Sequence, residues 1–211
     1  MKLPMLLPLV LALGAPGAAA ALELRADKVE VSFHIEHPAK EYDAFLRPGG
    51  GVGVITLDPQ AIESTRATFT IKVDHLDSEN TRRDSHMMEV LEGLVHPTIV
   101  WTVQSVQGAA GPLKPGVTRV TATGPITIHG VTKPLSVPLE VTVGGKGELA
   151  ISASFAVSLE TFGIERPTLV FVPIEDVVPI VVRVETAANP AVLAPPTPAP
   201  SAPVPAPEAS P

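Results

Sequence analysis

The sequence has no cysteine and very few large aromatic side chains. Its 211 residues include one Trp, one Tyr and six Phe. Without thiols the chain can form no disulfide framework, thiolate zinc site or catalytic cysteine, so the fold must depend on its own apolar core. The aromatic girdles of a membrane-spanning barrel are also missing, which argues against a barrel whose apolar residues face outward.

Long apolar runs and an excess of basic residues are absent as well. No segment approaches the roughly 20 consecutive apolar residues that a transmembrane helix needs, and the formal net charge is −7. Nucleic acids require a clustered basic face, and anionic membranes attract basic segments. We therefore expect no transmembrane segment and no nucleic-acid partner.

The two ends of the chain differ in composition from the rest. Residues 1–20 combine an early Lys2, an apolar run and the small residues Ala18, Ala19 and Ala20, which is the pattern of a secretory signal peptide. Residues 188–211 are almost entirely Ala and Pro and predict a disordered, extended tail. We therefore expect an exported protein, periplasmic or secreted, with a single domain over residues 21–187.

Apolar and polar residues alternate through almost all of this domain. Such alternation predicts β-strands with one dry and one wet face. The alternating segments are residues 29–35, 67–73, 99–103, 120–128, 135–143, 149–159 and 178–184. Gly and Pro clusters separate them, and only residues 82–94 favour a helix. The pattern predicts an antiparallel all-β fold, either a sandwich or, because closure removes exposed edges, a barrel of about eight strands.

Histidines and glycines give no clear metal or phosphate site. His34 and His37 are the closest pair of the six histidines, but residues three apart on a strand point to opposite faces. The other candidates, His75, His96 and His129, are expected at the surface or in turns. Gly49, Gly50, Gly51 and Gly53 are not followed by a helix, so we interpret them as a hairpin turn rather than a phosphate loop. We expect no metal and no cofactor.

The segment "ENTRRDSHMM", residues 79–88, is the most polar cluster of the chain. It has three interpretations: a capped helix with an Arg83–Asp84 pair, a contact for a ligand head group, or a catalytic centre. Asn80 is a good N-cap for a helix that starts at Thr81. Because no activated nucleophile accompanies the cluster, we expect no catalytic residue.

Four motifs resemble the YceI-like family. They are Val31-x-Phe33-x-Ile35-x-His37, Asn80-x-x-Arg83-Asp84-x-His86, "GPITIHGVTKPL" from Gly124 to Leu135, and Phe162-Gly163-Ile164. The resemblance implies a periplasmic, lipocalin-like β-barrel with one short helix that binds polyisoprenoids or other long amphiphilic lipids. This chain departs from the family pattern in "MMEVLEGLVHP", which replaces an aromatic pair and a following acid, and at Thr161, where an acidic residue is usual. These departures predict a remodelled cavity mouth.

The functional hypothesis is therefore a binding protein whose apolar lumen holds a long-chain amphiphilic lipid. The expected lumen residues are Phe33, Phe69, Ile71, Trp101, Val103, Ile126, Leu139 and Phe155. The expected mouth residues are Arg82, Arg83, His86, Met87 and Met88. Two alternatives stay open: an envelope interaction protein with a packed barrel that uses its Pro/Ala tail, and a small hydrolase that depends on His86. The oligomeric state and the identity of the lipid are left open.

Overall fold

The computed structural model describes residues 21–169 and 171–194. The predicted signal peptide, residues 1–20, and residues 195–211 of the predicted tail lie outside the described residues. In the described ranges no helix has both the length and the apolar character needed to cross a membrane.

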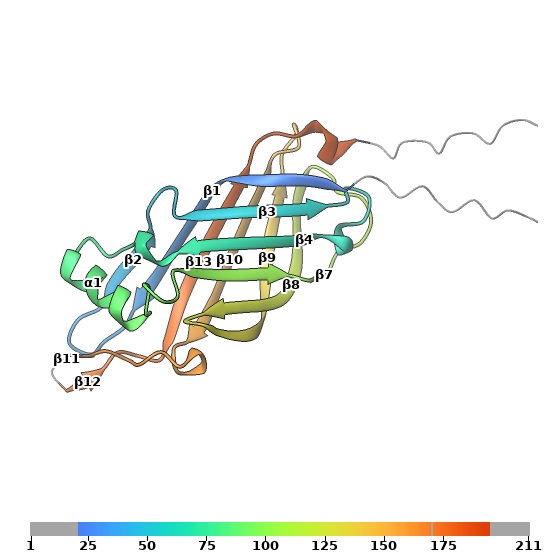
Figure 1. The fold of residues 1–211 in the computed structure, drawn as a ribbon. Coiled ribbons are helices and arrows are strands. Elements are labelled where there is room, and N and C mark those ends of the chain that lie inside the picture. Colours follow the sequence, from blue (N-terminus) through green and yellow to red (C-terminus); the bar gives the residue numbers. More distant parts are fainter. Residues whose placement is uncertain (1–20, 170, 195–211) are drawn as a thin grey trace, which may run out of the picture.

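The described chain consists mainly of strands, with one α-helix (Figure 1). The strands are β1 Leu22–Ile35, β2 Tyr42–Leu46, β3 Gly51–Leu57, β4 Arg66–Lys72, β5 Leu76–Asp77, β6 Thr98–Val103, β7 Ser105–Gln107, β8 Gly116–Ile128, β9 Val131–Val143, β10 Leu149–Ser158, β11 Thr168–Leu169, β12 Val172–Pro173 and β13 Val177–Thr186. The helix is α1 Thr81–Val90, and the 3₁₀ turns are η1 Ile62–Ser64, η2 Val73–His75, η3 Glu160–Phe162 and η4 Pro190–Leu193.

Eight of these strands close into an antiparallel barrel, in the order β13-β10-β9-β8-β6-β4-β3-β1. The barrel closes because β1 pairs with β13 over seven residue pairs, from Ala26↔Thr186 to Phe33↔Ile180. The two ends of β1 pair with different partners, β3 at residues 22–25 and β2 at residues 32–35. The predicted all-β barrel with one helix is confirmed, and the sandwich alternative is wrong.

The alternation in the sequence becomes the inside and outside of the barrel. In β10 the side chains of Ile151, Ala153 and Phe155 point into the barrel and are partly buried, whereas Ser152 and Ser154 are exposed. The apolar faces of the barrel strands therefore meet in a common interior. A membrane barrel would have the opposite arrangement.

Strand β3 corrects the interpretation of the glycine segment. Only Gly49 and Gly50 lie in the turn, and Gly51 and Gly53 belong to the strand. A Cβ atom on Gly53 would lie 2.7 Å from a ring carbon of Phe69, and one on Gly51 would lie 2.7 Å from the Cβ of Val29. These glycines make room for inward side chains of neighbouring strands, which a local sequence pattern does not reveal.

The pairing of β9 with β10 is short. It covers Leu149–Ala153 only, although β10 continues to Ser158 and β9 begins at Val131. Beyond Ala153 the next part of the chain carries Phe162 and Ile164, each 4% exposed, which pack with residues of β8, β9 and α1. Side-chain packing thus replaces backbone pairing in this part of the wall.

The end of the barrel opposite α1 is covered by residues 188–194, which the composition predicts to be part of the disordered tail. Asn189 caps η4 by accepting a hydrogen bond from the amide of Ala191 at 3.1 Å, and Val192 is 1% exposed against the core. The start of the disordered tail at residue 188 is therefore wrong for residues 188–194. The Ala/Pro composition concealed Val192, which gives this segment enough apolar surface to pack. In Figure 1, η4 and the start of β1 lie together at this end.

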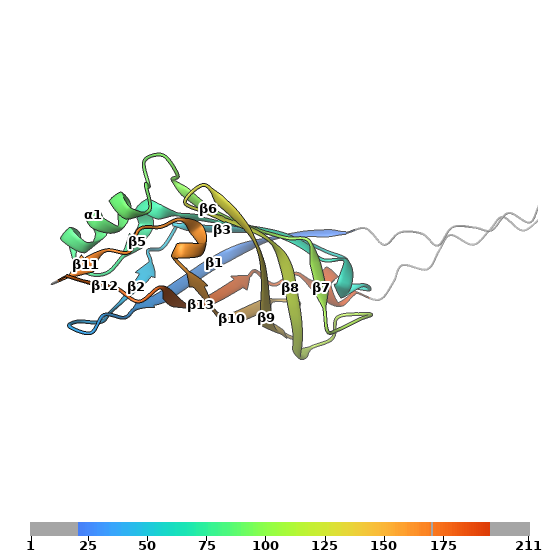
Figure 2. The same ribbon diagram turned by 90° about the horizontal axis from the view of Figure 1, so that it is seen from below.

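Helix α1 lies across the other end of the barrel (Figures 1 and 2). Asn80 caps it as predicted, because the amide of Arg83 donates to its side-chain oxygen at 3.1 Å. The helix ends at Val90 rather than at residue 94, since Glu92 adopts a left-handed conformation with φ of 47°. The amide of Gly93 then donates to the carbonyl of Met88 at 2.8 Å, which completes a C-terminal capping motif.

Candidate functional site

The interior of the barrel is not filled. It contains a cavity of about 320 Å³ that extends from η1 at one end to α1 at the other. The lining is almost entirely aliphatic and aromatic, with Arg83 and His86 as its only charged or titratable side chains besides Tyr42. A volume of this size lies at the lower end of the range for small-molecule sites.

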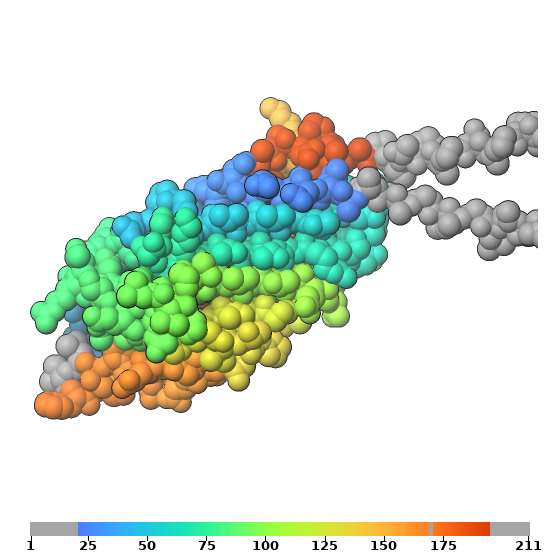
Figure 3. Space-filling model, viewed as in Figure 1, coloured from blue at the N-terminus to red at the C-terminus, as the bar shows by residue number. Residues whose placement is uncertain are grey.

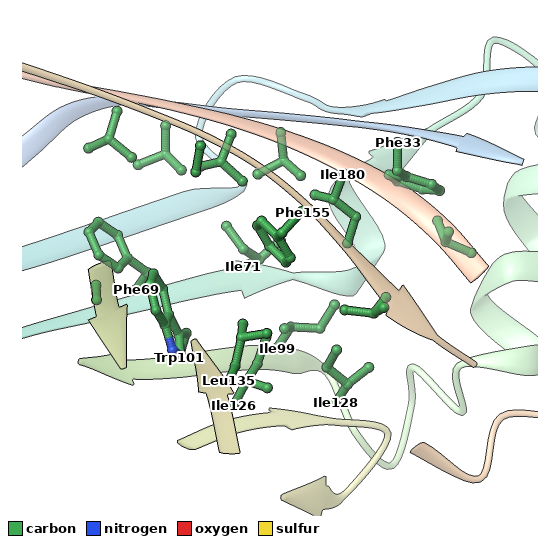
Figure 4. Close-up of a pocket in the computed structure, with 18 of the residues that line it drawn as sticks. Phe33, Phe69, Ile71, Ile99, Trp101, Ile126, Ile128, Leu135, Phe155 and Ile180 are labelled. Atoms are coloured by element: carbon green, nitrogen blue, oxygen red, sulfur yellow. The ribbon is translucent and has the colours of Figure 1, made fainter. Parts of the chain in front are cut away.

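All eight predicted lumen residues line this cavity. Figure 4 shows most of them pointing inward from strands on different sides of the barrel, with Trp101 beside Phe69. They converge because each occupies an inward position of its strand, and strand alternation repeats every two residues.

The two largest side chains of the middle of the cavity form a pair. The rings of Phe69 and Trp101, on the adjacent strands β4 and β6, have centroids 6.1 Å apart and an angle of 25° between their planes. The indole N–H of Trp101 donates to the carbonyl of Gly124 at 3.3 Å. That bond satisfies the polar atom of the indole, so the ring presents an apolar surface to the lumen.

Arg83 is held in place at the α1 end of the cavity. Its Nη2 donates to the carbonyl of Ser78 at 2.6 Å, its Nε donates to Ser78 Oγ at 3.2 Å, and its guanidinium carbon lies 4.5 Å from the ring centroid of Tyr42. The expected direct pair with Asp84 is wrong. Instead, Asp84 accepts from the amide of Ser78 at 2.8 Å and from its hydroxyl at 2.6 Å, so both charged side chains use Ser78.

Helical periodicity decides which of the predicted mouth residues reach the cavity. Arg83, His86 and Met87 line it, but Arg82 and Met88 do not. Residues 83, 86, 87 and 90 share one face of a helix, and residues 82 and 88 lie outside that stripe. Arg82 is exposed to solvent, and Met88 packs over Gly93 and an adjacent cluster.

Tyr42 is a mouth residue that the sequence analysis did not identify. Burial raises the pKa of its phenol above 10.0, although the neighbouring Arg83 cation acts in the opposite direction. The phenol is therefore neutral at physiological pH and can donate a hydrogen bond. Tyr42 is the only Tyr of the chain, which could have drawn attention to it. It was missed because the short strand β2 shows no alternation of apolar and polar residues in the sequence. Val90 and Leu91 were missed too, and extending the helical stripe from residue 83 would have found Val90.

One polar atom lies unpaired at the opposite end of the cavity. The hydroxyl of Thr65, next to η1, is buried and has no hydrogen-bond partner among the described residues. An unpaired buried hydroxyl costs free energy, so this position is a local weakness of the core.

The closest pair of histidines in the sequence, His34 and His37, do not share a site. The imidazole of His34 contacts Asp43 at 2.8 Å and Glu41 at 3.4 Å, whereas His37 is buried and hydrogen-bonded to the carbonyl of Val172 at 3.0 Å. Within residues 21–169 and 171–194, no group of three or more His, Asp or Glu side chains has an arrangement suited to a metal ion.

The barrel, its apolar cavity and the short helix at one end are features that this chain shares with a known family. Residues 22–186 match the YceI-like domain over their whole length. The chain belongs to the YceI-like family. The predicted membership of this family is thereby confirmed, and the match covers the barrel from β1 to the end of β13.

Curated YceI-like relatives are similar to this chain at a moderate level. Protein YceI of Salmonella newport is 27% identical over 146 residues, which cover 63% of this chain and 67% of that protein. Protein YceI of Salmonella arizonae shows the same identity and coverage.

Solved YceI-like structures share the fold at lower identity. The polyisoprenoid binding domain from Saccharophagus degradans superposes with a TM-score of 0.62 at 14% identity, covering 81% of this chain and 99% of that domain. BcnA of Burkholderia cenocepacia gives 0.64 at 15% identity, covering 75% and 96%. The YceI protein of Campylobacter jejuni gives 0.57 at 20% identity, covering 73% and 90%. At these identities the comparison establishes the fold alone.

Proposed function

We propose that this protein is an exported, non-enzymatic binding protein that holds an amphiphilic lipid in its barrel. The single observation that carries the proposal is the distribution of polarity in the cavity, which is apolar along the barrel and has its titratable side chains, Tyr42, Arg83 and His86, only at the α1 end. A long apolar chain gains free energy by burial in such a lumen, at about 25 cal/mol per Å². The polar end of the same molecule then lies beside Arg83 and His86.

Arg83 is the best candidate for the head-group contact. Two of its nitrogens are used by Ser78, but a guanidinium has five N–H groups, so donors on its third nitrogen stay available. No ion pair to Arg83 occurs in the described part of the chain. A guanidinium held rigidly and facing a cavity suits a phosphate or diphosphate group.

The relatives support a polyisoprenoid as the ligand class. The Saccharophagus degradans structure is described as a polyisoprenoid binding domain, and its fold is that of this barrel. Export through the predicted signal peptide, residues 1–20, belongs to the same proposal. The lining, in which aliphatic side chains predominate, suits a flexible, methyl-branched chain.

The direct test is a titration followed through Trp101, the only Trp of the chain. Because its ring lines the lumen, a bound chain changes its emission. We expect saturable changes with geranylgeraniol and with geranylgeranyl diphosphate, and we expect lipid to be recovered by mass spectrometry from organic extracts of the purified protein. Unchanged emission together with an empty extract would refute the proposal.

Arg83→Ala separates a head-group contact from a structural role. We expect binding of the diphosphate to weaken about tenfold or more, since hydrogen bonds to charged groups contribute about 1.5–3 kcal/mol, while binding of the alcohol changes much less. Arg82→Ala is the matched control, because Arg82 is on the same helix but outside the cavity. Equal losses for both ligands in Arg83→Ala would mean that Arg83 only supports the mouth.

The alternative of an interaction protein with a packed barrel is weakened by the cavity, and the role of the tail stays a prediction. A chain that ends at residue 194 keeps η4 and removes the rest of the Pro/Ala segment. We expect this truncated protein to bind the lipid as well as the full chain does. Loss of a protein partner without loss of lipid would assign the partner to the tail.

A further inference from the structure

Two short loops carry the most exposed large apolar side chains of the described residues. The loop between α1 and β6 carries Leu94 and Val95, which are 94% and 70% exposed. The connection between β11 and β12 carries Phe171, which is 100% exposed, followed by Val172 at 42%. Exposed aromatic and aliphatic side chains of this size lower the solubility of a protein and often mark a surface that contacts a partner or a membrane.

Both loops lie at the end of the barrel that α1 covers, where the polar mouth of the cavity is (Figures 1 and 2). The space-filling view shows α1 and the region of β11 and β12 together forming this end (Figure 3). The other exposed large apolar side chains are on barrel strands or on β2, and none is more than 58% exposed. Complete exposure at loop tips is therefore particular to the mouth.

Hydrogen bonds hold the backbone of both loops. In the first loop the amides of Val95 and His96 both donate to the carbonyl of Glu92 at 2.8 Å. In the second loop the amide of Ile174 donates to the carbonyl of Pro167 at 3.0 Å, and the imidazole of His37 bonds the carbonyl of Val172 at 3.0 Å. Hydrogen bonds thus hold the described backbone on either side of these apolar side chains.

We propose that these two loops insert Leu94, Val95, Phe171 and Val172 into the interfacial region of a lipid bilayer and so bring the mouth of the cavity against the membrane. The inference rests on the proposed function, because a ligand that resides in a membrane must enter the lumen from it. Direct docking spares the apolar chain of the ligand a passage through water.

A bilayer fits these loops better than a protein partner does. The apolar side chains are on two separate protrusions, whereas a stable protein interface needs a continuous complementary surface of about 1,000 Å² or more. Helix α1 and the loop after it carry two Arg and three acidic residues, so this end has no basic excess, and the chain is acidic, with a formal net charge of −7. Charge therefore does not drive the contact, and we expect binding to neutral phosphatidylcholine that is insensitive to salt.

The experiment is flotation of the full-length mature protein with phosphatidylcholine vesicles, at about 0.1 M and about 1 M salt. We expect the protein to float at both concentrations. The double variant Leu94→Ser, Phe171→Ser should bind at least about tenfold more weakly, since each residue loses burial of a large apolar side chain. Because both side chains are fully exposed and outside the cavity lining, the variant should fold.

The matched control is Val117→Ser, at the start of β8 near the opposite end of the barrel, where the valine is 58% exposed. It should float like the unmodified protein. Flotation that fails for the unmodified protein, that disappears at high salt, or that persists unchanged in the double variant would overturn the docking proposal. Lipid binding measured through Trp101 in separate, vesicle-free detergent solution tests the lumen independently, because the double variant should still bind geranylgeraniol there.

Discussion

Replacing Ala153 with a larger side chain tests whether the barrel interior contains free space. The free energy of unfolding should rise if the space is free and fall if it is already filled. Ala153 lies on β10, faces the lumen and pairs with Leu139 on β9 and Val182 on β13, which also line the cavity. Ala153→Leu adds three carbon atoms to this space. At about 0.8 kcal/mol for each buried CH₂, the added burial stabilises the protein by at most about 2.4 kcal/mol. The lost rotamer freedom of Leu costs about 0.5–1 kcal/mol.

We therefore expect the free energy of unfolding of the ligand-free protein to rise by about 1.5 kcal/mol. A change of 1 kcal/mol shifts the melting temperature by about 2–4 °C for a chain of this size, so calorimetry should show a rise of about 3–6 °C. The same side chain occupies ligand space, so geranylgeraniol should bind more weakly. Stability and binding then change in opposite directions.

Ala156→Leu is the control for Ala153→Leu. Ala156 is on the same strand and faces solvent, so the change in stability should stay within about 0.5 kcal/mol. If Ala153→Leu instead destabilises the protein by about 1–3 kcal/mol, the interior has no free space, because that is the cost of overpacking a filled core. The proposal that the barrel holds a lipid would then lose its physical basis.

Three further predictions concern single positions. Thr65→Val removes the unpaired buried hydroxyl and should raise the free energy of unfolding by about 1 kcal/mol in chemical denaturation; a loss would mean that the hydroxyl has a partner in solution. Gly53→Ala should destabilise the protein by about 1–3 kcal/mol in the same assay, because its Cβ would lie 2.7 Å from the ring of Phe69; a neutral effect would contradict the close packing. The hydrogen bond to Asp43 raises the pKa of His34 above 6.5, so the stabilisation by this pair is present below that pH and is lost as the pH rises through the raised pKa. Asp43→Asn should therefore reduce stability more at low than at high pH, and the NMR titration of His34 should shift to lower pH; an unchanged titration would remove Asp43 as the cause.

The barrel was predictable because strand alternation is a local property with a large energetic consequence. A period of two placed Phe33, Ile71 and Phe155 on inward faces without any knowledge of strand order. The same reasoning failed at β3, because Gly51 and Gly53 serve the side chains of other strands. It also failed at residue 188, where one buried residue, Val192, outweighed the composition around it.

The mouth was less predictable because several interactions of similar strength compete there. The sequence placed Arg83 and Asp84 side by side and suggested that they pair, but both bind Ser78, which a loop brings within reach. The helix ends at Val90, before the end of the expected segment 82–94, since Glu92 adopts the left-handed conformation that usually belongs to Gly. Tertiary contacts decide such choices, and the local pattern does not contain them.

The short pairing of β9 with β10 leaves the width of the barrel less tightly fixed there than between the other strands. A hydrogen-bonded ladder fixes the spacing of two strands, because any widening breaks several bonds at once. Beyond Ala153 the two strands are instead bridged by Phe162 and Ile164, and apolar contacts have no fixed direction. Widening along this seam breaks no backbone ladder, so we expect the barrel to adapt its width here to bulkier ligands while the remaining strand pairs keep their register.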